Sequence, residues 1–411
     1  MPRLLHDRLT WLSYAQLGVW GFFLYGFGPV VPLLRDEQHT SAAVAGLHST
    51  GLAVGGVLGG LLFPVLSRRL GRGWATWCAL AGVAVGVAAL CLLRPTAATL
   101  AATVFTSTAG TLLVSGINTT LVAHHRSAAP AAISEANAAC AGMGILAPIV
   151  IGLAVGAGAG WRPALAAEVG LIALVALAAL AFRVRPGRGA DPTTGTASAG
   201  RLPRAYWIAW CLLGVTGSIE VCLSLWSADV LRTHAGMSAG AASAALASIV
   251  AGMCVGRIAG GRVALRVPPI PLLVGALGVS LAGFAVFWLA TVGWLAVLGL
   301  LLVGLGNGMH YPLGISVALA AAEGQADRAS AYSSYSVAVG FGVAPVVLGR
   351  LSDVAGPHLA FLLVPGLIAV AALLAVRLGR ALRLRAAALP PLDARIDGPA
   401  APAVQAAEAE A

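Results

Sequence analysis

Twelve apolar stretches run through the sequence, and each is long enough to cross a lipid bilayer as a helix. Such a helix needs about 20 mostly apolar residues. Only 10% of the residues are charged, whereas an ordinary soluble domain carries about 25%. We therefore predict an all-α polytopic membrane protein. Its twelve transmembrane helices are expected at residues 12–33, 42–65, 74–93, 97–122, 134–156, 161–182, 205–230, 239–263, 270–290, 293–320, 329–350 and 358–378.

One long break divides these stretches into six and six. It is rich in Pro, Gly, Thr and Arg, a composition typical of a flexible linker. The Ala- and Pro-rich C-terminal segment is typical of a disordered tail. We expect a six-helix bundle at 1–182, a cytoplasmic linker at 183–204, a second six-helix bundle at 205–385 and a disordered cytoplasmic tail at 386–411.

The arginines predict the orientation of the chain in the membrane. All 25 basic residues are arginine. With the N-terminus in the cytoplasm, 19 of them fall on the cytoplasmic side, five fall on the other side, and Arg257 lies within a stretch. Cytoplasmic loops carry the excess of positive charge. We expect a multi-pass protein of the cell (plasma or inner) membrane, with both termini in the cytoplasm.

The residues that most enzymes and metal sites need are missing or wrongly spaced. The absence of lysine excludes a P-loop lysine and Schiff-base chemistry. The six cysteines lie in apolar stretches without metal-ligand spacing. The arginines do not gather on one soluble face, as nucleic-acid binding would require. We expect a monomer that is not an enzyme, needs no metal or cofactor, and binds no nucleic acid.

The two groups of stretches are related as repeats. One set of residues in the second and fifth stretches recurs in the eighth and eleventh at a constant offset of 197. Parallel six-helix repeats around a site at the bilayer midplane are one known architecture of secondary transporters. The matched residues are Gly55, Gly59, Arg69, Ala147, Pro148 and Gly152 with Gly252, Gly256, Arg266, Ala344, Pro345 and Gly349.

At this point the chain resembles the major facilitator superfamily. The family's loop motif after the second helix is Gly-x-x-x-Asp-Arg-x-Gly-Arg, and Arg69, Gly71 and Arg72 fit it, while Pro64 and Arg68 replace the first Gly and the Asp. The resemblance implies twelve helices, alternating access, and a gating role for this loop.

A second family motif points to the exporters of drugs and metabolites. In the fifth helix of that branch it reads Gly-x-x-x-Gly-Pro-x-x-Gly-Gly, and Pro148 and Gly152 match it here. Small residues allow helices to approach closely, and proline bends them. We therefore assign helix packing or gating to these two residues and to their repeat partners Pro345 and Gly349.

Glu220 is the sharpest candidate for chemistry. It lies near the middle of the seventh stretch, where an ionisable residue is costly and indicates function by default. We predict that Glu220 carries the coupled proton, the alternative being a structural acid hydrogen-bonded to a neighbouring helix. Ser224 follows one turn later on the same face.

Other polar residues are candidate ligands of the substrate. Asn307, His310 and Tyr311 share one face of the tenth stretch, where His310 is a candidate helper in proton transfer. The family resemblance implies that stretches 1, 4, 7 and 10 line the cavity. It adds Tyr25, Asn118 and Ser224 to Asn307 and Tyr311 as candidate substrate ligands, with helix packing as the alternative.

Arg257 is a candidate ligand for an anion. It lies about 9 Å from the middle of its stretch, toward the cytoplasm. That depth argues against a direct pair with Glu220.

These features predict a secondary transporter that works by alternating access. We expect proton-coupled export of a small organic molecule, drug-like or metabolite, whose partners are the substrate, protons and the lipid bilayer. One alternative is a proton symporter that imports a small organic anion, with Arg257 and His310 as counter-charges. An alternative of another class is a non-transporting membrane sensor or scaffold.

Overall fold

The computed structural model describes residues 6–125, 129–183, 201–264, 266–322 and 325–388, and within them the regular structure is entirely helical. The N-terminal half contains α1 (Arg8–Gln38), α2 (Ala42–Leu70), α3 (Arg72–Leu92), α4 (Thr96–His125), α5 (Ala129–Gly156) and α6 (Trp161–Ala181). The C-terminal half contains α7 (Arg204–Thr233), α8 (Ala239–Ala245), α9 (Ala247–Val263), α10 (Pro269–Leu289), α11 (Gly293–Ala320), α12 (Ala326–Ala355), α13 (Pro357–Ala360) and α14 (Leu363–Ala388).

The predicted all-α fold with twelve membrane-spanning helices is confirmed. Twelve helical segments of the described chain are long and apolar enough to cross a bilayer, and they coincide with the twelve stretches. The expected linker lies mostly outside the described residues, as does the expected tail beyond Ala388.

Two of the expected helices are broken. The eighth stretch forms α8 and α9, separated at Leu246, and the twelfth forms the short α13 followed by α14. The second break has a local cause. Pro365 lies in the first turn of α14, and its ring excludes the helical position of the carbonyl of Phe361. The chain therefore starts a new helix at Leu363.

The outer wall of the bundle is apolar, as a surface in contact with lipid must be. Leu92, Leu180 and Val354 are 79%, 74% and 76% exposed. Soluble proteins rarely show such continuous apolar surface. The polar side chains of the spanning helices are instead largely buried, among them His48, Glu168 and Asp229.

Glycines repeat one helix contact in the two halves. In each half, two glycines four residues apart press one helix onto the backbone of another, as small residues do in membrane bundles. In the N-terminal half Gly55 and Gly59 meet Val104 and Thr108. In the C-terminal half Gly252 and Gly256 meet Leu301 and Leu305. Each contact recurs 197 residues later, so the sequence repeat is also a structural repeat.

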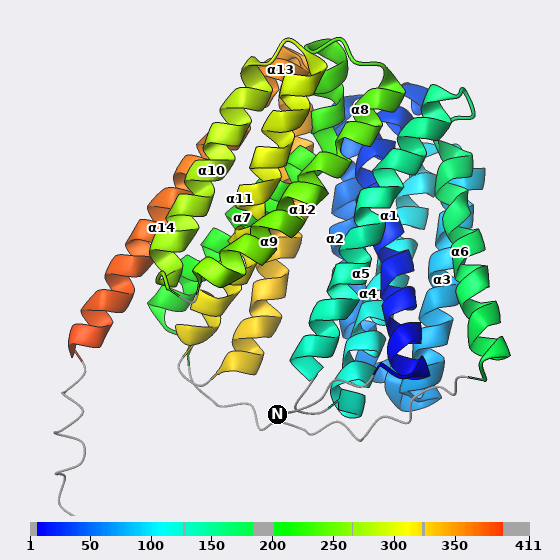
Figure 1. The fold of residues 1–411 in the computed structure, drawn as a ribbon, viewed down its shortest axis with the longest axis horizontal. Coiled ribbons are helices and arrows are strands. Elements are labelled where there is room, and N and C mark those ends of the chain that lie inside the picture. Colours follow the sequence, from blue (N-terminus) through cyan, green and yellow to red (C-terminus); the bar gives the residue numbers. More distant parts are fainter. Residues whose placement is uncertain (1–5, 126–128, 184–200, 265, 323–324, 389–411) are drawn as a thin grey trace, which may run out of the picture.

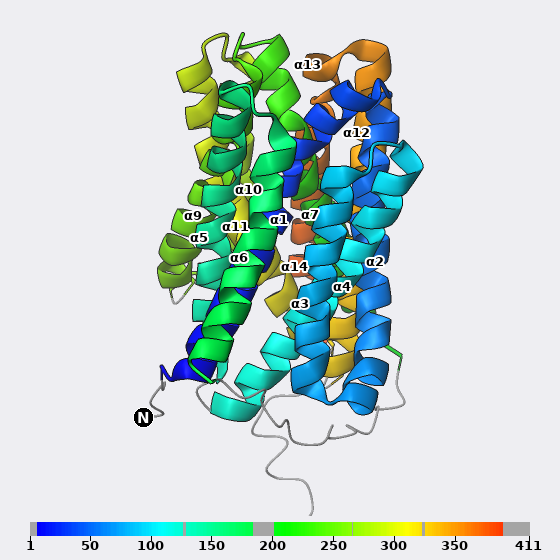
Figure 2. The ribbon, with the colours of Figure 1, turned by 90° about the vertical axis from the view of Figure 1, so that its right-hand side faces the viewer.

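The two halves lie side by side, with α1–α6 and α7–α14 forming separate groups of helices (Figure 1). We call the end at which α1 begins and α14 ends the terminus-bearing end, and the other the opposite end. The contacts between the halves join α2 to α12, α5 to α8 and α1 to α7. Figure 2 shows the long helices extending between the two ends.

The glycine contacts make a prediction about stability. A β-carbon at Gly283 of α10 would meet the backbone of Leu302 and Val303, whereas one at Gly278 of the same helix meets open space. Gly283→Ala is expected to destabilise the fold by about 1–3 kcal/mol. Thermal unfolding in detergent measures the effect, with Gly278→Ala as the control. Equal melting temperatures for the two variants would contradict the packing seen here.

Candidate functional site

A central cavity of about 620 Å³ lies between the two halves. Its walls come from α1, α2, α4 and α5 on one side and from α7, α9 and α12 on the other. Its volume lies within the range of about 300–1,000 Å³ that is usual for small-molecule sites.

The walls of the central cavity are apolar and aromatic. Among the residues that the structure describes, five aromatic side chains line it, together with hydroxyl groups and a single carboxylate, that of Glu220. The aromatic residues are Trp20, Tyr25, Phe27, Tyr335 and Phe341, and the hydroxyl residues include Ser107, Thr111, Ser115 and Ser224. This lining suits a molecule with a large apolar part.

A smaller cavity of about 180 Å³ adjoins the central one inside the C-terminal half. Glu220, Val337 and Phe341 line both cavities, so the two share a wall. The remaining residues around the small cavity are Thr216, Gly217, Arg257, His310 and Tyr311. The structure thus groups three of the predicted polar residues of α9 and α11 around Glu220.

Packing contacts place Arg257 at the level of Glu220. Gly314 of α11 lies against Leu213 of α7, and Gly308 lies against the backbone nitrogen of Arg257. α7 and α11 run in opposite directions, so six residues back along α11, from Gly314 to Gly308, cover the same axial distance as six residues forward along α7, from Leu213 to Ile219. Arg257, beside Gly308, therefore lies at the axial level of Ile219 and Glu220. The expected depth difference between Arg257 and Glu220 is therefore wrong. The Arg257 charge acts on Glu220, although the two form no ion pair in the described chain.

Tyr25 approaches this pair from the N-terminal half. Its ring lies on Gly144 of α5, where any side chain would collide with it. Tyr25 lies within electrostatic reach of both Glu220 and Arg257. Glu220 thus lines the central cavity together with the Tyr25 phenol and the small cavity together with the Arg257 guanidinium.

The predicted polar face of α11 is divided between two environments. His310 and Tyr311 line the small cavity. Asn307 lines neither cavity and is buried against α10, where Ser280 Oγ donates to Asn307 Oδ1 over 3.2 Å. Ser280 Oγ also lies 3.3 Å from His310 Nε2. The helix-packing alternative thus describes Asn307 better than substrate contact does.

Ser224 and Asn118 also differ in position. Ser224 lines the central cavity and its hydroxyl donates to the backbone carbonyl of Glu220 over 2.9 Å. Asn118 lines neither cavity, and its Oδ1 is buried without a hydrogen-bond partner among the described residues. In this conformation Ser224 faces the central cavity and Asn118 does not, so substrate contact by Asn118 stays a prediction.

Two ion pairs join the halves at the opposite end. The buried Asp229 of α7 binds Arg35 of α1 through both carboxylate oxygens. Beside it, Arg232 Nη1 donates to Asp36 Oδ2 over 2.7 Å. We call these four residues the inter-half lock, because they connect the last turns of α1 and α7 above the cavity.

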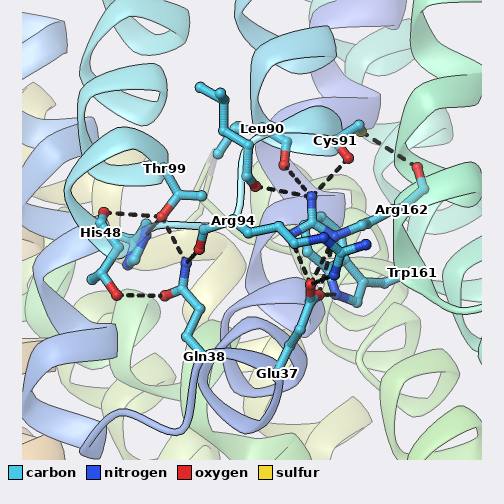
Figure 3. Close-up of polar contacts among 11 residues, drawn as sticks. Glu37, Gln38, His48, Leu90, Cys91, Arg94, Thr99, Trp161 and Arg162 are labelled. Atoms are coloured by element: carbon cyan, nitrogen blue, oxygen red, sulfur yellow. Dashed lines mark hydrogen bonds and ion pairs between the residues drawn. The ribbon is translucent and has the colours of Figure 1, made fainter.

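The next two residues of α1 are anchored within the N-terminal half. Figure 3 shows Glu37 held by Arg162, Arg94 and Trp161, with Arg162 Nε 3.1 Å from Glu37 Oε2. Gln38 donates to Thr99 Oγ1 over 3.0 Å. Four consecutive residues thus divide their contacts, with Arg35 and Asp36 crossing to the other half and Glu37 and Gln38 fixing α1 to its own.

A second connection joins α2 to α12. The Asp353 carboxylate of α12 accepts from the backbone N–H groups of Ala42 and Ala43, at 2.7 and 3.0 Å, and so caps the first turn of α2. Further along, Ser49 and Thr50 donate to the carbonyls of Phe341 and Gly342. This connection crosses between the halves.

The small residues of the exporter motif and their repeats also lie between the halves. Gly152 of α5 meets Gly240 and Ala244 of α8, and Gly349 of α12 meets Ala42 of α2. Pro148 lines the central cavity. The carbonyl of Pro345 accepts from Trp226 Nε1 over 3.2 Å. These positions suit surfaces that slide or separate during transport.

The loop motif lies at the terminus-bearing end, away from both cavities. Arg69 and Gly71 are exposed and Arg72 is half-buried. Gly71 has a φ of 76°, which favours glycine, and it joins the end of α2 to the start of α3. No described residue forms an ion pair with Arg69 or Arg72. The gating role implied by the family resemblance stays a prediction.

Polar contacts also fix the start of α1 at this end. Asp7 caps α1 by accepting from Thr10 N over 2.9 Å, and His124 Nε2 lies 2.7 Å from its other oxygen. Burial raises the pKa of Asp7, but the hydrogen bonds of Thr10 and the charge of His124 outweigh it and hold the pKa below its usual value.

The inter-half lock and Asp353 did not emerge from the sequence. Their charges lie at helix ends, where Arg and Asp are usual, so nothing marks them as partners. One signal was present. Asp36 and Arg232 are 196 residues apart, almost the repeat offset, and carry opposite charges. Equivalent residues near the axis between two repeats are candidates for contact.

Twelve spanning helices in two repeated halves around a central cavity define a membrane transporter. The family model of the Major Facilitator Superfamily matches residues 17–337. The chain therefore belongs to the Major Facilitator Superfamily, which confirms the resemblance. No curated protein matches it in sequence.

Several solved structures share the fold. The nucleoside transporter NupG is 14% identical, with a TM-score of 0.70 over 90% of this chain and 98% of its own. A bacterial homologue of the human lysosomal transporter Spinster is 16% identical, with a TM-score of 0.64 over 91% and 93%. A variant of the E. coli fucose:proton symporter FucP is 18% identical, with a TM-score of 0.58 over 90% and 98%. At these identities the likeness shows the fold alone.

The inter-half lock makes a prediction about conformation. Removing one partner of a buried ion pair is strongly unfavourable, by about 3–5 kcal/mol. Arg35→Ala and Asp229→Asn are each expected to raise the population open at the opposite end by at least about tenfold. Electron–electron distance measurements between spin labels at the exposed Ala97 and Leu359 would detect the opening, in a background without the native cysteines.

Arg94→Ala is the matched control, because Arg94 is exposed and pairs only within the N-terminal half. Exchanging the charges of Arg35 and Asp229 should restore part of the closed population. A distance distribution that Arg35→Ala leaves unchanged would remove these residues from the closure of this end.

Proposed function

We propose that the protein is a proton-coupled secondary transporter that moves a small, largely apolar organic molecule by alternating access. One observation carries this proposal. Glu220 is the single acid that lines the central cavity in the described chain, and no described side chain donates a hydrogen bond to its carboxylate. An acid without a fixed partner can take up and release a proton when its cavity opens to one side or the other.

The distribution of arginines supports a cytoplasmic terminus-bearing end. In that orientation the inter-half lock and the capping of α2 by Asp353 close the outer side. Tyr25 and Ser224 then contribute polar contacts to the substrate, and the aromatic walls enclose its apolar part. Tyr311 and His310 act from the small cavity, with His310 beside Glu220 as a helper in proton transfer.

Export in exchange for protons is the first candidate for the direction. A substrate that donates a hydrogen bond to the Glu220 carboxylate competes with the proton for the same oxygens. Such competition is the requirement for antiport, because substrate and proton then occupy the site in turn. The exporter motif around Pro148 and Gly152 supports this direction.

Uptake of a small organic anion together with a proton is the second candidate. The placement of Arg257 favours it. A permanent cation next to Glu220 attracts an anion most strongly when Glu220 is protonated, so anion and proton bind together rather than in competition. The two candidates therefore predict opposite signs of coupling.

Vesicle experiments test the role of Glu220. In inverted vesicles that are acidic inside, small amphipathic compounds added to the medium should cause proton release from wild type, reported by a pH-sensitive dye. Glu220→Gln should reduce this release to background, because the glutamine cannot carry a proton. Glu168→Gln is the matched control, since Glu168 is also buried within a spanning helix but lines neither cavity.

The same assay separates the two directions. Release that survives in Glu220→Gln would place the coupled proton elsewhere. In right-side-out vesicles, an added organic anion that makes the medium more alkaline would identify uptake and overturn export.

A further inference from the structure

We propose that the small cavity binds the carboxylate of an amphipathic organic monoanion, with Arg257 as its counter-ion and the apolar body of the molecule in the central cavity. The anion binds together with a proton on Glu220. This inference rests on the proposed function and deepens its second candidate, uptake together with a proton, for which it names the substrate class.

Positive and negative charge balance around the two cavities. In the described ranges, Glu220 and Arg257 are the permanently or readily charged side chains that line them, and His310 is the one imidazole. Among the other acids of the C-terminal half whose side chains the structure describes, Asp229 pairs with Arg35 and Asp353 caps the start of α2, both at the opposite end. Glu220 is therefore the acid available to balance Arg257.

Protonation of Glu220 changes the charge balance between Glu220 and Arg257. With Glu220 ionised, the pair is neutral. When Glu220 takes up a proton, Arg257 is left as an uncompensated charge inside the bundle, which is strongly unfavourable in a medium of low polarity. A bound monoanion restores neutrality, whereas a dianion leaves an excess of negative charge. Proton and monoanion must therefore promote each other's binding by the same factor.

The shapes of the two cavities suit a carboxylate joined to an apolar body. A guanidinium binds a carboxylate through two parallel hydrogen bonds. Thr216 and Tyr311 add hydroxyl groups to the same small cavity. Its 180 Å³ is less than a drug-sized ligand needs, while the adjoining 620 Å³ cavity is large enough and mainly apolar. The shared wall at Glu220, Val337 and Phe341 lets one molecule extend from one cavity into the other.

Several other titratable groups lie around Glu220, Arg257 and Tyr25. None of them is an acid that could replace Glu220 as the partner of Arg257. They are Tyr25 of α1, Cys140 of α5, Cys254 of α9, His310 and Tyr311 of α11, and Tyr335 of α12.

Binding to the purified full-length protein tests the site without requiring transport. Titration calorimetry would compare a graded series of phenylalkanoates with their neutral amides and with chloride. We expect the phenylalkanoates to bind with uptake of about one proton per anion at alkaline pH. The amides should bind at least about tenfold more weakly, because they lack the charge that Arg257 recognises.

Two arginines of α9 provide a matched pair of variants. Arg257→Gln should abolish phenylalkanoate binding. Arg262→Gln should leave it unchanged, because Arg262 is exposed, donates to the Ile258 carbonyl and lines neither cavity. Arg257→Lys keeps the charge and should retain part of the affinity, which separates loss of the ligand contact from loss of the fold.

Glu220→Gln gives the most specific outcome. The neutral amide imitates the protonated acid, so this variant should bind phenylalkanoates at alkaline pH at least about tenfold more tightly than wild type, and without proton uptake. An unchanged proton uptake in Glu220→Gln would contradict the proposed proton site, while binding that still depends on Arg257 would leave the anion site intact.

Three results would overturn the anion site itself. The first is wild-type binding in Arg257→Gln. The second is equal affinity for acids and amides. The third is binding of chloride without binding of any phenylalkanoate, which would make the small cavity a site for an inorganic ion instead of a substrate carboxylate.

Discussion

The ion pairs between Arg35 and Asp229 and between Asp36 and Arg232 fix how the two halves stand against each other. They join α1 and α7, the two helices that run through the centre of the molecule. With that end closed, the central cavity becomes a space bounded by both halves, and Tyr25 faces Glu220 across it. Because Glu37 holds the end of α1 to its own half, a movement of one half against the other would pull the ion pairs of the lock apart.

The bilayer sets a second constraint, which acts on every polar group of the spanning helices. Most hydroxyl groups return a hydrogen bond to a backbone carbonyl one turn earlier, as Ser218 and Thr106 do. Glycines allow the helix backbones to touch. Buried groups without a hydrogen-bond partner occur elsewhere in the described chain, as at Glu168 and Asn118, but Glu220 and Arg257 lack a direct partner and also line a cavity. The Glu220 carboxylate can therefore take up a proton, and the Arg257 guanidinium can bind an anion, at the walls of the two cavities.

The fold could be predicted from the sequence because a spanning helix requires a run of apolar residues that nothing else explains. Glu220 could be predicted for the converse reason, since an acid inside such a run is conspicuous. The depth of Arg257 relative to Glu220 could not be predicted from the sequence. Periodicity shows which face of a helix a residue occupies, but it does not show how far one helix is shifted along its axis relative to another. Periodicity also cannot separate Asn307 from Tyr311, which share a helix face but meet α10 and the small cavity respectively. The break before Leu363 was not predicted, since 358–378 was expected as one helix, and neither were the partners of Asp229.

The contact between Asp36 and Arg232 has a consequence for how such a molecule arises. The two residues are 196 positions apart, close to the offset of 197 at which glycine contacts repeat in the two halves. Gly28 and Ser224, also in contact, have the same separation. At the offset of 197, Arg232 is the repeat equivalent of Arg35. In a symmetric dimer of a six-helix ancestor, an acid at position 36 of each copy would therefore face an arginine at position 35 of the other, so the attraction between acid and base does not require that the two copies were fused into one gene.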